Sequence, residues 1–158
     1  MNYDVWGKSS SSVGPNAPLN DTCAPSSAQN GSAVSAIQAW INAKFPIYQI
    51  ILGIPSYGHS FRVKKGDALD ASGNILLSAP FDKTDQPAGD KWDGTASGVD
   101  VCGNANVVGG LFDFWGLIDA GFLNANGTPS SGIHSTYDVC SKTVRALHTH
   151  RNYGSFQL

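Results

Sequence analysis

Glutamate is absent from the 158-residue sequence, in which all 12 acidic residues are aspartate. This absence excludes any mechanism that relies on a glutamate of this chain. Charged residues make up only 14% of the sequence, and the net charge of -2 comes without a block of one sign. Binding to nucleic acid or to an acidic membrane surface needs a positive patch, so neither partner is expected. No apolar run approaches the ~18 residues of a membrane-spanning helix.

Cysteine is scarce and odd in number, with Cys23, Cys102 and Cys140 as the three positions. Their spacing does not match a zinc site, so neither a metal nor a cofactor is expected. An odd count predicts one disulfide and one free thiol. Cys102 and Cys140 flank a compact segment rich in glycine and aromatic residues, and they are the predicted pair.

Three acceptor triplets for N-linked sugar begin at Asn20, Asn30 and Asn126, each in a stretch typical of a surface loop. They favour a secretory history, although residues 1–4 do not resemble a signal peptide. The chain also combines 18 glycines, four tryptophans and five tyrosines with few charges. Because aromatic faces stack on sugar rings, this composition points to a neutral polymer outside the cell.

Residues 1–55 have the pattern strand, helix, strand. Residues 1–5 form a candidate strand, and Ser32 can cap a helix whose apolar positions recur at three- and four-residue steps. This helix is expected to end near Lys44, because Pro46 disfavours helical backbone before it, and to bury Trp40 in the core. The apolar run 49–55 predicts a strand buried on both faces. One such unit cannot bury both of its faces, so other units must be missing or come from another chain.

From Ser56 onward the pattern predicts a separate α+β unit of shorter elements. A strand is expected over residues 74–81, mostly loop over 82–106, and an aromatic-rich helix over 111–123. Trp92 and Trp115 are expected in the core of this unit. Residues 144–158 show no clear period of either kind.

Several of these segments resemble one known family. Residues 1–4, Met-Asn-Tyr-Asp, resemble the M-x-Y-D motif of the sixth strand of family 18 glycoside hydrolases. Residues 13–19, 31–34 and 54–61 resemble the next helix and the seventh strand of fungal-type chitinases in that family. Residues 112–123 and 137–141 resemble the α+β insertion between their seventh and eighth strands. The matches run in order over residues 1–143.

The resemblance implies an α/β fold containing part of a (β/α)₈ TIM barrel. Residues 1–55 would supply strands 6 and 7 with the helix between them, and residues 56–143 would form the insertion domain. Residues 144–158 would be a divergent tail, or the product of a reading-frame or gene-model error. The eighth strand, with the tryptophan beneath the reacting sugar in relatives, is not recognisable.

Family 18 enzymes use the N-acetyl oxygen of the substrate as the nucleophile, so the resemblance implies residues that hold this group in chitin or chitooligosaccharides. Tyr3 would donate to the acetamido carbonyl, Asp4 would bind a sugar hydroxyl and Met1 would pack beneath the acetyl methyl. Tyr57 would face the same groove. Trp6, just past the end of the first predicted strand, is a further candidate to line this groove. The alternative is a structural tyrosine at position 3 and a turn or cap residue at position 4.

Two departures from the family pattern concern single positions. His59 stands where the animal branch has arginine and is expected to be a structural hydrogen-bonding residue. Ser9 replaces a tryptophan that stacks on the leaving-group sugars in many relatives.

The family places its general acid in the pattern D-x-x-D-x-D-x-E at the end of strand four, which would lie upstream of Met1. Since that glutamate is missing here, no catalytic residue is assigned. Three hypotheses remain: an incomplete chitinase without activity of its own, a chitin-binding lectin-like module, or a fragment that does not fold stably. The full-length family is secreted.

Overall fold

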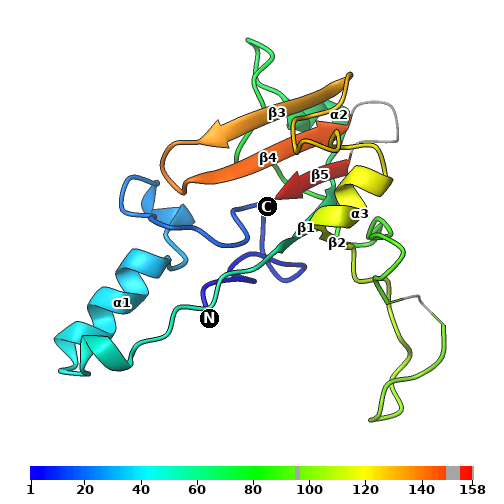
Figure 1. The fold of residues 1–158 in the computed structure, drawn as a ribbon. Helices are drawn as coiled ribbons and strands as arrows, with labels where there is room; N and C mark the ends of the chain where they lie inside the picture. Colours follow the sequence, from blue (N-terminus) through cyan, green and yellow to red (C-terminus); the bar gives the residue numbers. More distant parts are fainter. Residues whose placement is uncertain (95–96, 149–153, 158) are drawn as a thin grey trace.

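A five-stranded antiparallel sheet forms the centre of the computed structural model, which describes residues 1–94, 97–148 and 154–157 (Figure 1). The strand order is β2-β1-β5-β4-β3, so β1 pairs on both sides with strands from distant parts of the chain. The strands are β1 (Tyr57–Arg62), β2 (Leu111–Asp113), β3 (Ile133–Asp138), β4 (Thr143–His148) and β5 (Gly154–Gln157). The helices are α1 (Ala33–Asn42), α2 (Lys65–Ala68), α3 (Phe114–Asp119) and the 3₁₀ turns η1 (Ser26–Ala28) and η2 (Ile47–Gln49).

Residues 144–158, for which the sequence shows no clear period, contain most of β4 and all of β5. β4 and β5 are integral strands, and β5 joins β1 to β4. The buried Arg145 of β4 donates from Nη1 to the carbonyl of Leu76 at 2.9 Å, which ties this strand to the preceding loop. Residues 149–153 and 158 of the predicted tail lie outside the described residues. The sequence pattern did not predict β5 because this strand depends on its pairing with β1, which lies far away in the sequence.

Two apolar clusters pack against the sheet. The first joins Val13, Phe61, Val63, Ala68, Ala79 and Leu147. The second lies under α3 and joins Phe112, Leu117, Phe122 and Leu123. Most of the described core therefore belongs to the sheet domain and not to residues 1–55.

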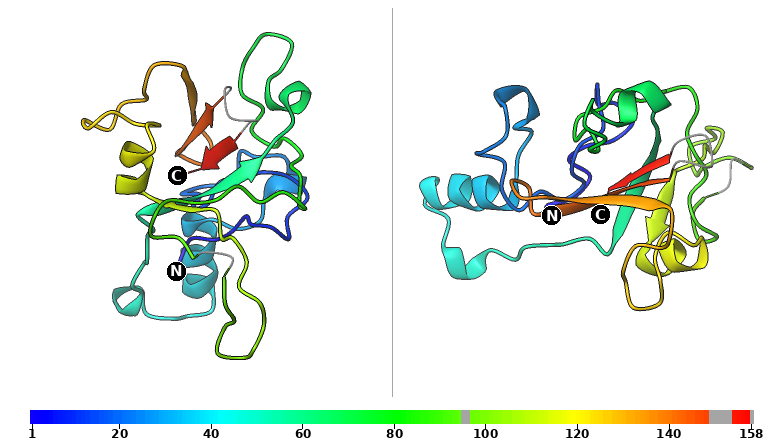
Figure 2. Two further views of the ribbon diagram at one scale, coloured as in Figure 1. Left: turned by 90° about the vertical axis from the view of Figure 1, so that its right-hand side faces the viewer. Right: turned by 90° about the horizontal axis from the view of Figure 1, so that it is seen from above.

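The predicted helix of residues 33–44 is confirmed as α1. Ser32 and Ser35 form a reciprocal capping box at its start, which satisfies backbone N–H groups that the first turn leaves free. The expectation that Trp40 lies in the core was wrong, because α1 projects from the sheet and buries only Ala33 (Figures 1 and 2). Trp40 instead makes an edge contact with Phe45, with ring centroids 5.3 Å apart.

The two strands predicted within residues 1–55 do not form a hydrogen-bonded ladder. One backbone bond, from the amide of Asn2 to the carbonyl of Gly53 at 3.1 Å, joins residues 1–5 to the return segment 49–55. A strand needs neighbours on its edges, and Ile51 is 91% exposed. Residues 1–55 do run as an extended segment, a helix and a second extended segment. The apolar side chains of the helix and of the second extended segment are largely exposed to solvent.

The α+β unit differs from the prediction in three places. Residues 74–81 form no strand and contribute only the isolated bridge between Leu69 and Ile75. The helix predicted over residues 111–123 begins as β2 and is helical only as α3. Trp92 and Trp115 are 71% and 72% exposed, so their assignment to the core was wrong. The second apolar cluster fills the space under α3 without them.

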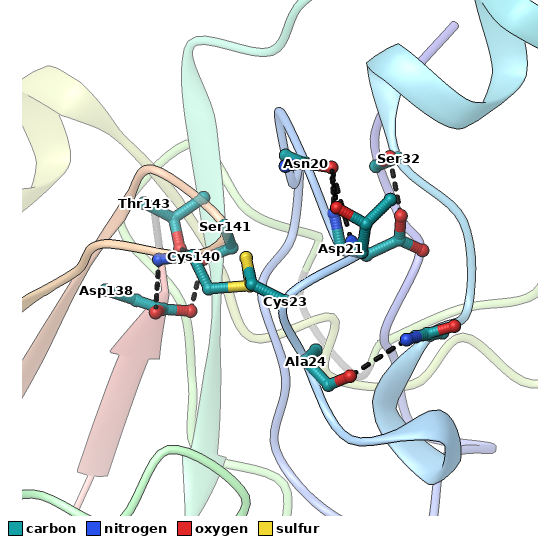
Figure 3. The surroundings of a disulfide bond; sticks show 11 residues. Asn20, Asp21, Cys23, Ala24, Ser32, Asp138, Cys140, Ser141 and Thr143 are labelled. Atoms are coloured by element: carbon teal, nitrogen blue, oxygen red, sulfur yellow. Dashed lines mark hydrogen bonds between the residues drawn. A yellow bond between two sulfur atoms is a disulfide. The ribbon is translucent and has the colours of Figure 1, made fainter.

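The disulfide joins Cys23 to Cys140, so the predicted pairing of Cys102 with Cys140 was wrong (Figure 3). The amide of Leu19 donates to the carbonyl of Ser141 at 2.8 Å, which brings the loop carrying Cys23 beside Cys140. Cys102 is free and exposed on a separate turn closed by Asp100.

Among the described helices, none is long and apolar enough to cross a membrane.

Candidate functional site

Two pairs of side chains that are far apart in the sequence, Tyr3 with Asp4 and Tyr57 with His59, meet at the start of β1. Tyr57 Oη donates to both carboxylate oxygens of Asp4 at 2.9 Å, and His59 Nε2 lies 2.8 Å from Asp4 Oδ1. An ionised carboxylate only accepts hydrogen bonds, so Nε2 carries the hydrogen in this contact. The ring of Tyr3 meets that of Tyr57 edge-on, with centroids 6.0 Å apart. The predicted residues Tyr3, Asp4 and Tyr57 are therefore brought together.

Asp4 is at the centre of this arrangement, yet its side chain remains 53% exposed. Its φ of 58° lies in the left-handed region, which costs a non-glycine residue on the order of 1 kcal/mol. Such a conformation persists only where neighbouring contacts hold it. The strained backbone turns the carboxylate toward Tyr57 and His59 while one side stays open to solvent.

Asn16 holds this backbone and was not identified from the sequence as a site residue. Its Oδ1 accepts from the amide of Asp4 at 3.1 Å, and its Nδ2 donates to the carbonyl of Tyr57 at 3.1 Å. Its own carbonyl accepts from the amide of Val5, and the residue is almost fully buried. The only signal in the sequence was its place within the family-like segment 13–19.

The hydroxyl of Tyr57 remains a hydrogen-bond donor far above neutral pH. Partial burial, followed by the hydrogen bond and the negative charge of Asp4, raises the pKa of Tyr57 to about 12. At pH 7 the phenol is protonated and donates to Asp4. His59 also hydrogen-bonds the Asp4 carboxylate, which agrees with the structural role expected for this histidine.

The hydroxyl of Tyr3 points to Met1, whose sulfur accepts its hydrogen bond at 2.6 Å. A thioether is a weak acceptor, so a carbonyl oxygen would compete well for this donor. Met1 itself is largely exposed. Tyr3 and Met1 therefore present one exchangeable donor and one apolar side chain beside Asp4.

Trp6 does not line an open groove, so its assignment to substrate binding was wrong. It is only 4% exposed, because residues 13–16 fold back over the indole. A Cβ atom at Gly14 would lie 2.0 Å from the ring, so glycine is needed for this close approach. Trp6 therefore packs inside the loop that carries Asn16.

The predicted glycosylation sites differ in exposure. Asn30 and Asn126 are exposed, whereas Asn20 is half-buried. The side-chain oxygens of Asn20 and Asn126 each accept from the threonine two residues later.

Among residues 1–94, 97–148 and 154–157, no three metal-ligating side chains gather in one place.

Comparison with known proteins identifies the family. The profile described as Glycosyl hydrolases family 18 matches residues 1–156. The chain belongs to this family. It is chitinase-like, and the family match extends past residue 143, where the resemblance seen in the sequence ended. The β4 and β5 strands thus lie within the family region.

Two curated relatives are described as chitinase-like effectors. The protein from Moniliophthora roreri is 55% identical over 145 residues, which cover 90% of this chain and 35% of the relative. The protein from Moniliophthora perniciosa is 49% identical over 145 residues, covering 91% of this chain and 32% of the relative. The chain therefore spans about a third of the length of these relatives.

Solved chitinase structures share the fold. A chitinase from Rhizomucor miehei matches with a TM-score of 0.79 and 30% identity, covering 100% of this chain and 40% of its own. A family 18 chitinase from Cycas revoluta, solved in complex with (GlcNAc)₄, matches with a TM-score of 0.61 and 19% identity, covering 99% of this chain and 33% of its own. The second match supports the fold alone.

Proposed function

We propose that these 158 residues bind chitooligosaccharides and do not hydrolyse them. One observation carries the proposal: Asp4 and Tyr57, 53 residues apart, meet in a hydrogen-bonded cluster that stays open to solvent beside Tyr3. The family membership supports chitooligosaccharides as the ligand, since Tyr3 and Asp4 belong to the family-like motif at residues 1–4.

The cluster suits an N-acetylated sugar for three reasons. The Tyr3 hydroxyl can exchange the weak Met1 sulfur for an acetamido carbonyl. Tyr57 and His59 hold the Asp4 carboxylate in place, and its exposed side can accept a sugar hydroxyl. Met1 supplies an apolar side chain for the acetyl methyl. Met1, Tyr3, Asp4 and Tyr57 are the proposed binding residues.

Hydrolysis is not proposed, because no proton donor is available in these residues. A general acid for glycoside cleavage is a carboxyl group whose pKa is raised. The chain has no glutamate. Hydrogen bonds from Asn74, Thr84 and Asn104 lower the pKa values of Asp70, Asp82 and Asp100, the opposite of what a proton donor requires.

We further infer that residues 1–55 are part of a (β/α)₈ barrel and that residues 56–156 are its insertion domain. The support is the uncovered apolar surface of α1 and the return segment, where neighbouring barrel units would pack. Its exposed members are Val34, Trp40, Ile47, Ile51, Leu52 and Ile54.

We also propose that the protein is extracellular. The Cys23–Cys140 disulfide persists in oxidising compartments and is rare in the cytosol. The three glycosylation triplets agree with this location. A reduced Cys23–Cys140 pair in protein from the natural source would contradict it.

The binding proposal is tested by calorimetric titration with chitobiose. We expect Asp4→Ala and Tyr57→Phe each to weaken binding by about tenfold to a hundredfold, because each removes a hydrogen bond to a charged group, worth ~1.5–3 kcal/mol. Tyr48→Phe is the matched control, since Tyr48 is exposed on η2 away from Asp4, and we expect no change. Equal affinities of all three variants and the unchanged chain would contradict the proposal.

A further inference from the structure

A cavity of about 490 Å³ lies between residues 87–91, β2 and α3. Its volume is within the range of small-ligand sites, which run from ~300 to ~1,000 Å³. Phe112 and Phe122 give it an apolar floor. Asp90 and Lys91 line it on one side, and Gly116 and Asp119 of α3 line it on the other.

This cavity is separate from the cluster around Asp4. Tyr57 pairs with Asp113, and the next pair joins Gly58 to Phe112. Because successive side chains of a strand point to opposite faces, Phe112 and the cavity lie on the face opposite to Tyr57. A ligand in the cavity would not occupy the Asp4 cluster.

Lys91 and Arg62, which line the cavity, are each paired with a carboxylate. Lys91 Nζ lies 2.7 Å from Asp119 Oδ2, and Arg62 Nε lies 2.9 Å from Asp85 Oδ2. The remaining carboxylate, Asp90, accepts backbone hydrogen bonds. A site built for an ionic ligand would leave a charge of one sign free, whereas these pairs suit a neutral ligand with many polar groups.

Two exposed tryptophans lie beside residues that line the cavity. Lys91 Nζ is 5.4 Å from the centroid of the Trp92 ring. Trp115 lies four residues before Asp119 on α3, so the two side chains share one face of the helix. Asp90 joins the segment of Trp92 to the start of α3: its Oδ1 accepts from the amide of Trp92 at 2.8 Å, and its Oδ2 accepts from the amide of Asp113, the N-cap residue of α3, at 2.7 Å. A Cβ atom at Gly116 would lie 2.0 Å from Asp90 Oδ2, so glycine permits this contact. One carboxylate therefore holds the two flanks together.

We propose that this cavity, with Trp92 and Trp115 at its rim, is a second carbohydrate-binding site that takes a neutral sugar of an oligosaccharide. Aromatic side chains receive the apolar faces of the ring, and the charged pairs receive its hydroxyl groups. The choice of a chitooligosaccharide as ligand rests on the proposed function. Two sites on opposite faces of β1 and β2 would let one molecule hold two chitin chains and strengthen its retention on the polymer.

The test is the stoichiometry of chitotetraose binding, measured by calorimetry on the 158-residue chain. We expect two sites in the unchanged protein. In Tyr57→Phe the Asp4 site is weakened, so at ligand concentrations that fill only the cavity we expect one site. In Trp92→Ala and Trp115→Ala we expect the second site to weaken about three- to tenfold while the Asp4 site is unchanged. Trp40→Ala is the matched control, since Trp40 is exposed on α1, and it should keep both sites.

The outcomes separate the two proposals. One site that is lost in Tyr57→Phe, with no effect of Trp92→Ala or Trp115→Ala, would overturn the second site and leave the proposed function standing. One site that is lost in Trp115→Ala and kept in Tyr57→Phe would support the cavity and contradict binding at Asp4. Circular dichroism of each variant excludes loss of the fold as the cause.

Discussion

The purified 158-residue chain is expected to release no sugar from chitin or from a chromogenic chitobioside. The physical reason is the missing proton donor, because a positioned general acid contributes ~10²–10⁴ to the rate. In the proposed function the cluster at Asp4 orients an N-acetyl group, but without a proton donor the departing sugar oxygen remains a poor leaving group. The assay follows release of the chromophore over several days at a pH between 5 and 8.

The Rhizomucor miehei chitinase serves as the positive control, since it aligns with the whole of this chain. A rate within tenfold of this control would show that an aspartate of the chain supplies the proton. An Asp4→Ala variant assayed in parallel distinguishes such activity from a contaminating enzyme, which the substitution would leave unaffected.

Loss of the Cys23–Cys140 disulfide should give the largest change in stability. The bond closes a sequence separation of 117 residues, which strongly restricts the unfolded chain. We expect Cys23→Ser and Cys140→Ser each to lower the free energy of unfolding by ~2–5 kcal/mol. Chemical denaturation monitored by tryptophan fluorescence measures this change.

Cys102→Ser is the internal control for this prediction. Cys102 is free and exposed, so its replacement should leave the unfolding midpoint unchanged. Titration of the unchanged protein should find one reactive thiol. A loss of stability in Cys102→Ser equal to that in Cys140→Ser would indicate the pairing that the sequence first suggested.

Features set by local sequence could be predicted well. Ser32 and the apolar spacing after it define α1, because a capping box involves only residues three apart. The approach of Tyr3 and Asp4 to Tyr57 followed from the family-like motifs, whose strand ends face one mouth. Asn16 escaped notice because its role depends on contacts with residues 12 and 41 positions away.

Features set by tertiary packing could not be predicted. Trp6 was expected in an open groove and Trp40 in the core, yet Trp6 is buried by a returning loop and Trp40 projects on α1. The cysteine pairing depended on the backbone contact between Leu19 and Ser141, which no spacing indicates. β5 was hidden because it is defined by pairing with β1, almost a hundred residues earlier.

The most direct test of sugar binding without hydrolysis is an NMR titration of the isotopically labelled chain with chitobiose. We predict that the largest amide shifts fall at Asp4, Asn16, Tyr57 and His59, and that the sugar signals show intact chitobiose after a week. Shifts that leave these four residues unchanged, or the appearance of free N-acetylglucosamine, would contradict the account.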